Sequence, residues 1–285
     1  MDRPGGEMGF CNLGPEPKVA KAVVHRGEEP PLVGSGGSGA VFFSGCTLRC
    51  VFCQNHQISQ GRLGEFTTPD ALAAEFIRLQ EKGCVNVNLV TPTPHLPAIL
   101  QSLAAARGLG LRIPIVYNTG GYESVEVLER LEGVVDVYLP DFKYGTNEAA
   151  ERFSSAPRYV EHALAAIVEM RRQVGRLEVR DGVAVRGMIV RHLVLPENLA
   201  RTDRALALLA ESVSTDIALS LMAQYQPSFL AARIRGIRRR LRPTEYERAV
   251  MTARALGFSE GWFQDLEQID GRFLPDFDRE DPFGS

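Results

Sequence analysis

The sequence predicts an α/β protein whose strands form one parallel sheet, curved into an open, partial (β/α)6 TIM-like barrel. Six apolar segments each precede a segment whose apolar residues recur at helical spacing. Alternation of this kind implies a parallel sheet with right-handed crossovers. The 285 residues suit one α/β barrel, and six units favour an open barrel over a closed one with eight.

The elements follow in order along the chain. Thr68 is expected to cap the first helix, with Pro69 at its first position and Gly83 just after its end. A capping box of Thr244 and Glu247 is expected to begin the last helix. The predicted strands are 40–43, 85–90, 113–117, 134–139, 187–195 and 217–222, and the helices between them pass through 99–106, 125–131, 159–174 and 204–209.

The segments before and after this barrel are not predicted to belong to it. Residues 1–39 are rich in Gly, Pro and charge, which predicts an irregular N-terminal lead. Its closing run, 34–39, precedes a strand instead of following one, so a flexible lead-in is expected and not a phosphate loop. We expect the barrel to span 40–258, and residues 259–285 to form a C-terminal tail.

Composition narrows the class of protein. With 45% apolar residues and a net charge of −3, the chain has material for a core and lacks the basic character of most nucleic-acid binders. No apolar run approaches the ~18 residues of a membrane span, and the first residues do not resemble a secretory signal. An odd, clustered set of five cysteines points to a reducing compartment, so a cytoplasmic protein is expected.

Three cysteines carry the chemistry. Cys46, Cys50 and Cys53 follow the first predicted strand with the spacing C-x3-C-x2-C. Three thiolates on one loop can hold an iron–sulfur cluster and leave one iron free for a substrate. His56 offers an alternative, because it would complete a structural Cys3His zinc site in a non-catalytic binding protein. A fortuitous cluster of thiols is the third interpretation.

The segment FFSGCTLRCVFCQNHQIS resembles the signature of radical S-adenosylmethionine (SAM) enzymes, and its surroundings resemble the pyruvate formate-lyase activating-enzyme-like group. Further matching segments are NLVTPTPH, IVYNTGGYE, VDVYLPDFKYG, RGMIVRHLVLPEN and MAQYQP. The resemblance implies a [4Fe-4S] cluster, SAM, and hydrogen abstraction by a 5′-deoxyadenosyl radical. It also implies an electron donor such as flavodoxin or ferredoxin, and a substrate that is a glycyl radical enzyme, another peptide or a small molecule.

The resemblance also assigns residues. Cys46, Cys50 and Cys53 would hold the cluster, with Phe52 beside them. At the place where the family carries Gly-Gly-Glu for the SAM amino group, this chain has Thr91 and Thr93, which alternatively only end a strand and cap a helix. The other expected SAM contacts are Asn118, Asp141, Lys143, Arg191 and Gln224.

Some residues remain outside this assignment. Asp141 and Lys143 lie two residues apart and are expected on the same side of the chain, with a solvated surface pair as the alternative. His192 is expected to be structural and Cys84 to be a core thiol, whereas Cys11 is isolated. The Arg-rich stretch 233–242 is predicted to be a solvated helix face, with contact to an acidic protein partner or to nucleic acid as the alternative.

Overall fold

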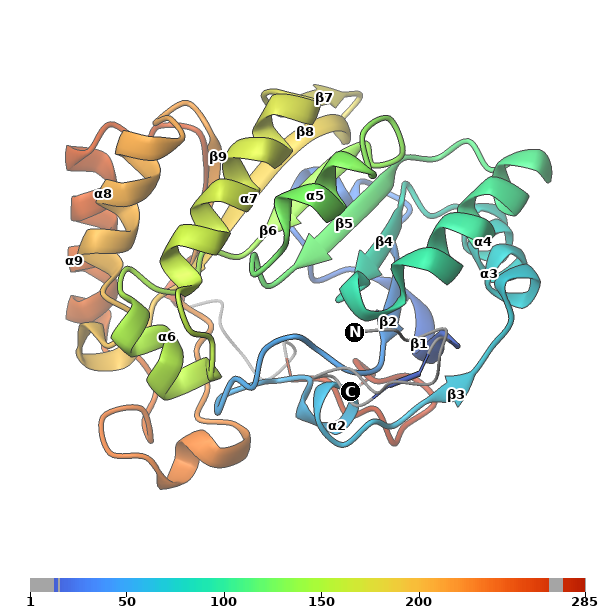
Figure 1. Cartoon of the computed structure of the whole chain (residues 1–285). Coiled ribbons are helices and arrows are strands. Elements are labelled where there is room, and N and C mark those ends of the chain that lie inside the picture. Colours follow the sequence, from blue (N-terminus) through green and yellow to red (C-terminus); the bar gives the residue numbers. More distant parts are fainter. Residues whose placement is uncertain (1–12, 15, 267–273, 285) are drawn as a thin grey trace.

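The computed structural model describes residues 13–14, 16–266 and 274–284, and it confirms the predicted architecture (Figure 1). Six parallel strands lie side by side in chain order, so each crossover joins neighbours. They are β2 (Ser38–Phe43), β4 (Val87–Val90), β5 (Ile115–Thr119), β6 (Val137–Pro140), β8 (Val183–Leu193) and β9 (Ala218–Met222). Within the described residues the sheet does not close on itself, which makes it a partial barrel.

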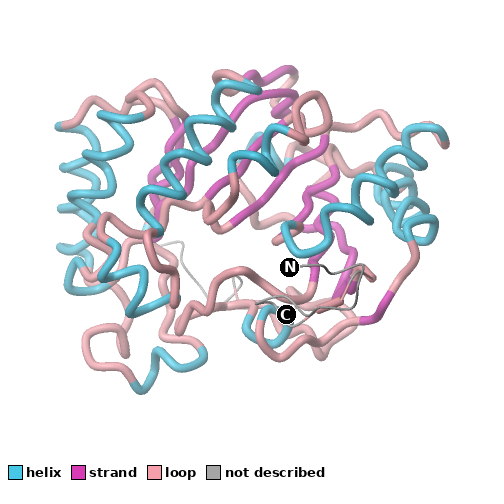
Figure 2. The backbone as a smooth tube through the Cα atoms, in the orientation of Figure 1, coloured by secondary structure: helices cyan, strands magenta, loops and turns pink. Residues whose placement is uncertain are grey.

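The long helices cover the outer face of this sheet, whereas the short α2 lies beside the cysteine loop (Figures 1 and 2). The longest are α3 (Pro69–Glu81), α4 (Leu96–Gly108), α7 (Tyr159–Val174), α8 (Thr202–Ser212) and α9 (Pro243–Ala255), and shorter ones are α2 (His56–Ser59), α5 (Val125–Glu129) and α6 (Asn147–Ser154). In the parallel strands, the residues that point outward pack against the helices. The residues that alternate with them point into the barrel interior.

The predicted helix ends are partly right. Thr68 caps α3, since its hydroxyl accepts from the backbone N–H of Ala71 at 3.2 Å. The predicted capping box of Thr244 and Glu247 is wrong. The capping box lies two residues earlier: Arg242 is the N-cap, α9 begins at Pro243, and the carboxylate of Glu245 accepts the backbone N–H of Arg242 at 2.8 Å.

The predicted irregular lead is also wrong from residue 18 onward; Cys11 lies outside the described residues. Strand β1 (Lys18–His25) pairs antiparallel with β2, and the short β3 (Glu65–Phe66) pairs with β1. The sequence pattern does not predict strand β1, because both faces of the strand are half buried and its residues show no alternation of apolar and polar side chains. The glycines before β2 are not flexible either: a Cβ at Gly36 would lie 1.9 Å from the carbonyl oxygen of Gly83, so this position requires glycine.

The one-turn helix α1 (Pro30–Val33) closes the barrel at the amino ends of its strands. Leu32 is fully buried against inward residues of four strands, including Val116, Leu139 and Ile189. The side chain of Asn86 holds the turn by donating to the carbonyl oxygen of Leu32 at 2.8 Å. The residues just before α1 are therefore held at the floor of the barrel interior.

The predicted tail contains more structure than a loop. Strand β10 (Gly261–Phe263) extends the sheet beyond β9 in parallel, and β7 (Glu178–Arg180) pairs antiparallel with β8. Farther on, Phe277 is buried against Phe42, with ring centroids 5.2 Å apart, and Phe283 contacts the ring of His25 at 4.1 Å. No helix among the described residues has the length and apolar character that crossing a bilayer demands.

Candidate active site

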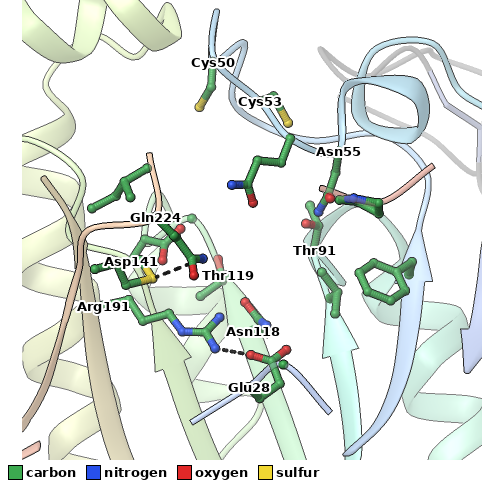
Figure 3. A pocket seen from close by; sticks show the side chains of 18 of the residues that line it. Glu28, Cys50, Cys53, Asn55, Thr91, Asn118, Thr119, Asp141, Arg191 and Gln224 are labelled. Atoms are coloured by element: carbon green, nitrogen blue, oxygen red, sulfur yellow. Dashed lines mark hydrogen bonds and ion pairs between the residues drawn. The ribbon is translucent and has the colours of Figure 1, made fainter. Parts of the chain in front are cut away.

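The cysteine loop begins directly after β2, at the carboxyl edge of the sheet. Gly45 turns the chain with φ = 81°, a conformation that glycine adopts without strain. The loop is fixed to the end of α6, because the backbone N–H groups of Arg49 and Val51 donate to Ser154 and Phe153, both at 2.9 Å. The thiols of Cys50 and Cys53 point into the space below the loop (Figure 3).

Apolar side chains alternate with the cysteines and hold the loop in place. Leu48 is 2% exposed, and Phe52 packs edge-on against Tyr225 and Tyr144 with ring centroids 5.9 and 6.5 Å apart. Phe52 also lines the cavity under the loop, where the sequence placed it. Burial of Leu48 and Phe52 fixes the loop, and both side chains line the same cavity as the three thiols.

Cys50 is buried, and Cys46 and Cys53 are half-buried. Burial, together with the neighbouring Cys50, raises the pKa of Cys46 to about 12, and the same two causes raise the pKa of Cys53 to about 11. Burial also raises the pKa of Cys50, although Lys143 opposes this shift. Thiolates so close together need a strongly positive partner, and an iron–sulfur cluster supplies one. The donor set thus fits such a cluster.

Below the loop lies a cavity of about 440 Å³, within the roughly 300–1,000 Å³ usual for small-molecule and cofactor sites. Its walls are inward residues at the carboxyl ends of the strands, as expected for an α/β barrel. The lining contains nearly all of the residues that the sequence selected: Cys46, Cys50, Phe52, Cys53, Thr91, Asn118, Asp141, Lys143, Arg191 and Gln224.

Asp141 and Lys143 lie on the same side of the chain after β6, as predicted, and form an ion pair. Their side chains are 22% and 19% exposed, so they are not a solvated surface pair. Burial opposes the charge of Lys143, but the carboxylate of Asp141 outweighs it and raises the pKa of Lys143. Tyr159 accepts the backbone N–H of Lys143 at 2.8 Å and fixes the turn.

Arg191 lines the cavity but is already engaged by two carboxylates that sequence reasoning missed. Its Nε and Nη2 donate to Glu29 at 2.8 and 2.5 Å, and Nη2 also contacts Glu28. Its guanidinium is therefore held at the barrel floor by the segment before α1, and its contact with SAM stays a prediction. These carboxylates precede Arg191 by more than 160 residues in the chain, and no local pattern indicates the pairing.

Thr93 is displaced from the site, contrary to expectation. It does not line the cavity; its hydroxyl donates to Glu123 at 2.6 Å and lies 3.2 Å from the hydroxyl of Tyr117. The buried carboxyl of Glu123 also accepts from Thr119, and burial raises its pKa to about 7. Thr91 does line the cavity, with φ = 59° directly after β4.

The zinc alternative is not supported by the described residues. His56 does not line the cavity: its ring stacks on Phe229 with centroids 4.9 Å apart, and Nδ1 lies 3.3 Å from the carbonyl oxygen of Cys53.

Two further expectations are confirmed at the edges of the site. His192 is buried, with its ring nitrogens 2.6 Å from the carbonyl oxygen of Phe142 and 2.9 Å from the hydroxyl of Thr202, so it is structural. Cys84 is a buried core thiol. The cavity also contains polar residues that sequence reasoning passed over: Gln54, Asn55, Thr119, Ser220 and Gln226. Of these, Thr119 and Ser220 lie in the last part of the strands β5 and β9, where a position in the cavity could have been predicted.

Comparison with known proteins decides the family. The sequence model of the Radical SAM superfamily matches residues 40–209, more than half of the chain. The "Uncharacterized protein MJ0674" of Methanocaldococcus jannaschii is 35% identical over 257 residues, covering 87% of this chain and 70% of that protein. The chain belongs to the radical SAM superfamily. As a radical SAM enzyme, it uses a [4Fe-4S] cluster and SAM, which agrees with the three cysteines that line the cavity.

Solved structures agree on the fold of this radical SAM enzyme. "Native anSMEcpe with bound AdoMet and Kp18Cys peptide" superposes with a TM-score of 0.51 at 11% identity, covering 74% of this chain and 56% of that one. "HydG: A maturase of the [FeFe]-hydrogenase" gives a TM-score of 0.50 at 14% identity, covering 75% and 48%. The chain thus spans about half the length of each.

Proposed function

We propose that this radical SAM enzyme is of the pyruvate formate-lyase activating-enzyme-like type and abstracts a hydrogen atom from an organic substrate in the cavity. When bound, the cluster supplies the electron that cleaves SAM into methionine and a 5′-deoxyadenosyl radical. The observation that carries the proposal is the convergence of Cys46, Cys50 and Cys53 on a cavity formed by the carboxyl ends of parallel strands.

The other lining residues receive proposed roles from their chemistry. Lys143, held by Asp141, is suited to the carboxylate or ribose of SAM, because a half-buried ammonium binds an anion strongly. Thr91 and Asn118 offer oxygen acceptors to the SAM amino group, since they end neighbouring strands β4 and β5. Gln224, which accepts from Gln264 at 2.7 Å, is placed for adenine or substrate.

The proposed electron donor is a flavodoxin or ferredoxin in the cytoplasm. The Arg-rich stretch 233–242 contains no α-helix, contrary to the predicted helix face. Phe229, four residues before this stretch, stacks on His56, three residues after Cys53, which supports the stretch as a docking surface for the donor. Five of its arginines, 233, 235, 238, 240 and 242, are exposed. An exposed basic surface next to the cluster loop suits an acidic redox protein.

Reductive cleavage of SAM tests the proposal. The reconstituted protein is incubated anaerobically with SAM and dithionite, and 5′-deoxyadenosine is quantified. We expect release by the wild type and by Cys84→Ser, a matched change of a buried thiol outside the cavity, and none by Cys53→Ser. Equal release by Cys53→Ser and wild type would contradict the proposal.

A further inference from the structure

Behind the wall of the cavity lies a buried carboxyl group that has no role in the proposed function. Glu123 comes four residues after the end of β5, is 5% exposed and does not line the cavity. Its Oε1 accepts from the hydroxyl of Thr93 at 2.6 Å and from that of Thr119. Thr93 lies just after β4 and Thr119 ends β5, so one carboxyl oxygen joins the ends of two neighbouring strands.

These two strand ends form the part of the wall to which the proposed function assigns the SAM amino group. Figure 3 shows Thr91 at the end of one strand and Asn118 and Thr119 at the end of the next. Thr91 has φ = 59°, a conformation that is rare for a β-branched residue and persists only where the surroundings hold it. Its backbone N–H donates to the carbonyl oxygen of Asn118 at 2.9 Å, and the bond between Thr93 and Glu123 anchors the turn that follows.

The turn after β5 reaches the cysteine loop. The hydroxyl of Thr119 accepts the backbone N–H of Gly121 at 3.3 Å, which fixes the turn around Gly120. Gly120 lines the cavity and approaches the cysteine loop closely, because a Cβ at this position would lie 2.7 Å from Cδ1 of Leu48. Through Thr119, Glu123 therefore also holds a turn that contacts the cysteine loop.

The carboxyl of Glu123 is held without a charged partner. Among the described residues nothing donates to its Oε2, and an ionised oxygen without a donor is costly in a buried place. The titratable side chains that face it from β5 and β6 are Tyr117 and Tyr138, and burial raises the pKa of both phenols, so they stay neutral. Other titratable groups nearby are engaged elsewhere: His95 by the carbonyl oxygen of Ser44, Lys143 by Asp141, and Glu126 by Ser124. Glu123 is therefore neutral below its raised pKa of about 7.

We propose that Glu123 is a positioning residue for SAM: its neutral carboxyl joins the ends of β4 and β5 and so presents Thr91 and Asn118 to the SAM amino group. Loss of the proton would leave a buried anion whose second oxygen has no donor, and the wall can relieve this cost only by opening Oε2 to water. The wall would then loosen, and the affinity for SAM would fall as the pH rises through about 7. The inference deepens the proposed function and rests on its assignment of the SAM amino group.

Calorimetric titration of the reconstituted protein with SAM at pH 6.5 and pH 8.0 tests this role. If only the neutral form of Glu123 holds the wall, a pKa of about 7 makes binding about eightfold weaker at pH 8.0. Glu123→Gln keeps a neutral group of the same size, so its affinity should match that of the wild type at pH 6.5 and exceed it about eightfold at pH 8.0. Titration of SAM itself is common to both proteins and cancels in this comparison. A residue that only stabilised the fold would not yield a variant that binds SAM more tightly than the wild type.

Glu169→Gln is the matched control, because Glu169 is a buried carboxylate that pairs with Arg172 and does not line the cavity. This variant should keep the pH dependence of the wild type. An equal pH dependence in Glu123→Gln and wild type, or weaker binding by Glu123→Gln at both pH values, would overturn the inference.

Thr93→Val covers the case in which Glu123→Gln does not fold, since valine has a similar shape and lacks the hydroxyl that bonds with Glu123. This variant should bind SAM about fivefold more weakly at pH 6.5, the loss expected from one hydrogen bond, and an unchanged affinity would overturn the inference. A wild type that shows the expected pH dependence and releases no 5′-deoxyadenosine would instead refute the proposed radical function alone.

Discussion

His192 should make the stability of the enzyme depend on pH in a defined window. Burial lowers its pKa from 6.5 to about 4, although the contact with the carbonyl oxygen of Phe142 opposes the shift. The unfolded chain therefore takes up a proton as the pH falls below about 6.5, while the folded protein does not until the pH approaches 4. This contribution to stability is fully present above pH 6.5 and is lost as the pH falls through the folded pKa.

The magnitude follows from the two pKa values. One pKa unit corresponds to about 1.4 kcal/mol, so the whole shift is worth about 3 kcal/mol. Between pH 7.5 and pH 5.5, the linkage relation gives a fall of about 1.4 kcal/mol in the free energy of unfolding from this residue alone. The range from pH 7.5 to pH 5.5 lies above the ordinary pKa values of Asp and Glu, so few carboxylates titrate within it.

Urea denaturation of wild type and His192→Gln at pH 7.5, 6.5 and 5.5 measures this effect. Other titrating groups are common to both proteins, so the difference between their pH dependences isolates His192. We expect His192→Gln to lose about 1.4 kcal/mol less than the wild type over this range. Parallel pH profiles for the two proteins would show that the imidazole is not held neutral by burial.

Three further predictions concern the barrel floor, the SAM site and the docking of the electron donor. Leu32→Ala should lower the free energy of unfolding by about 2–5 kcal/mol because it opens a cavity in the closed end, whereas Leu109→Ala, at a position 67% exposed, should cost far less in the same urea titration. Lys143→Met should weaken SAM binding about tenfold in calorimetry; an unchanged affinity would remove the lysine from the site. Arg238→Glu should slow reduction of the cluster by flavodoxin, most clearly at low salt, and leave reduction by dithionite unaltered; equal slowing by both reductants would contradict docking at this stretch.

Much of the site was readable from the sequence because it follows from two local rules. The apolar runs locate the strands, and in a parallel α/β barrel ligands lie beyond their carboxyl ends. Asn118 and Asp141 could be selected on that basis, and the spacing of the cysteines indicated their shared ligand. The pairing of Asp141 with Lys143 followed from the alternation of an extended chain.

The errors share one physical cause, which is contact between distant parts of the chain. Strand β1 could not be recognised because both faces are half covered by other elements. The pairing of Arg191 with Glu28 and Glu29 was not foreseen, because these carboxylates come from a segment that was predicted to be irregular. Thr93 was expected in the cavity and instead bonds with the buried Glu123, which only the assembled strands bring near.

The central claim, that three cysteines hold a cluster whose remaining iron binds SAM, is tested most directly by electron paramagnetic resonance of the reduced protein with and without SAM. The account predicts about four iron and about four sulfide ions per chain, and a cluster spectrum that changes when SAM is added. A colourless zinc protein, or an intact cluster whose spectrum is identical with and without saturating SAM, would contradict it.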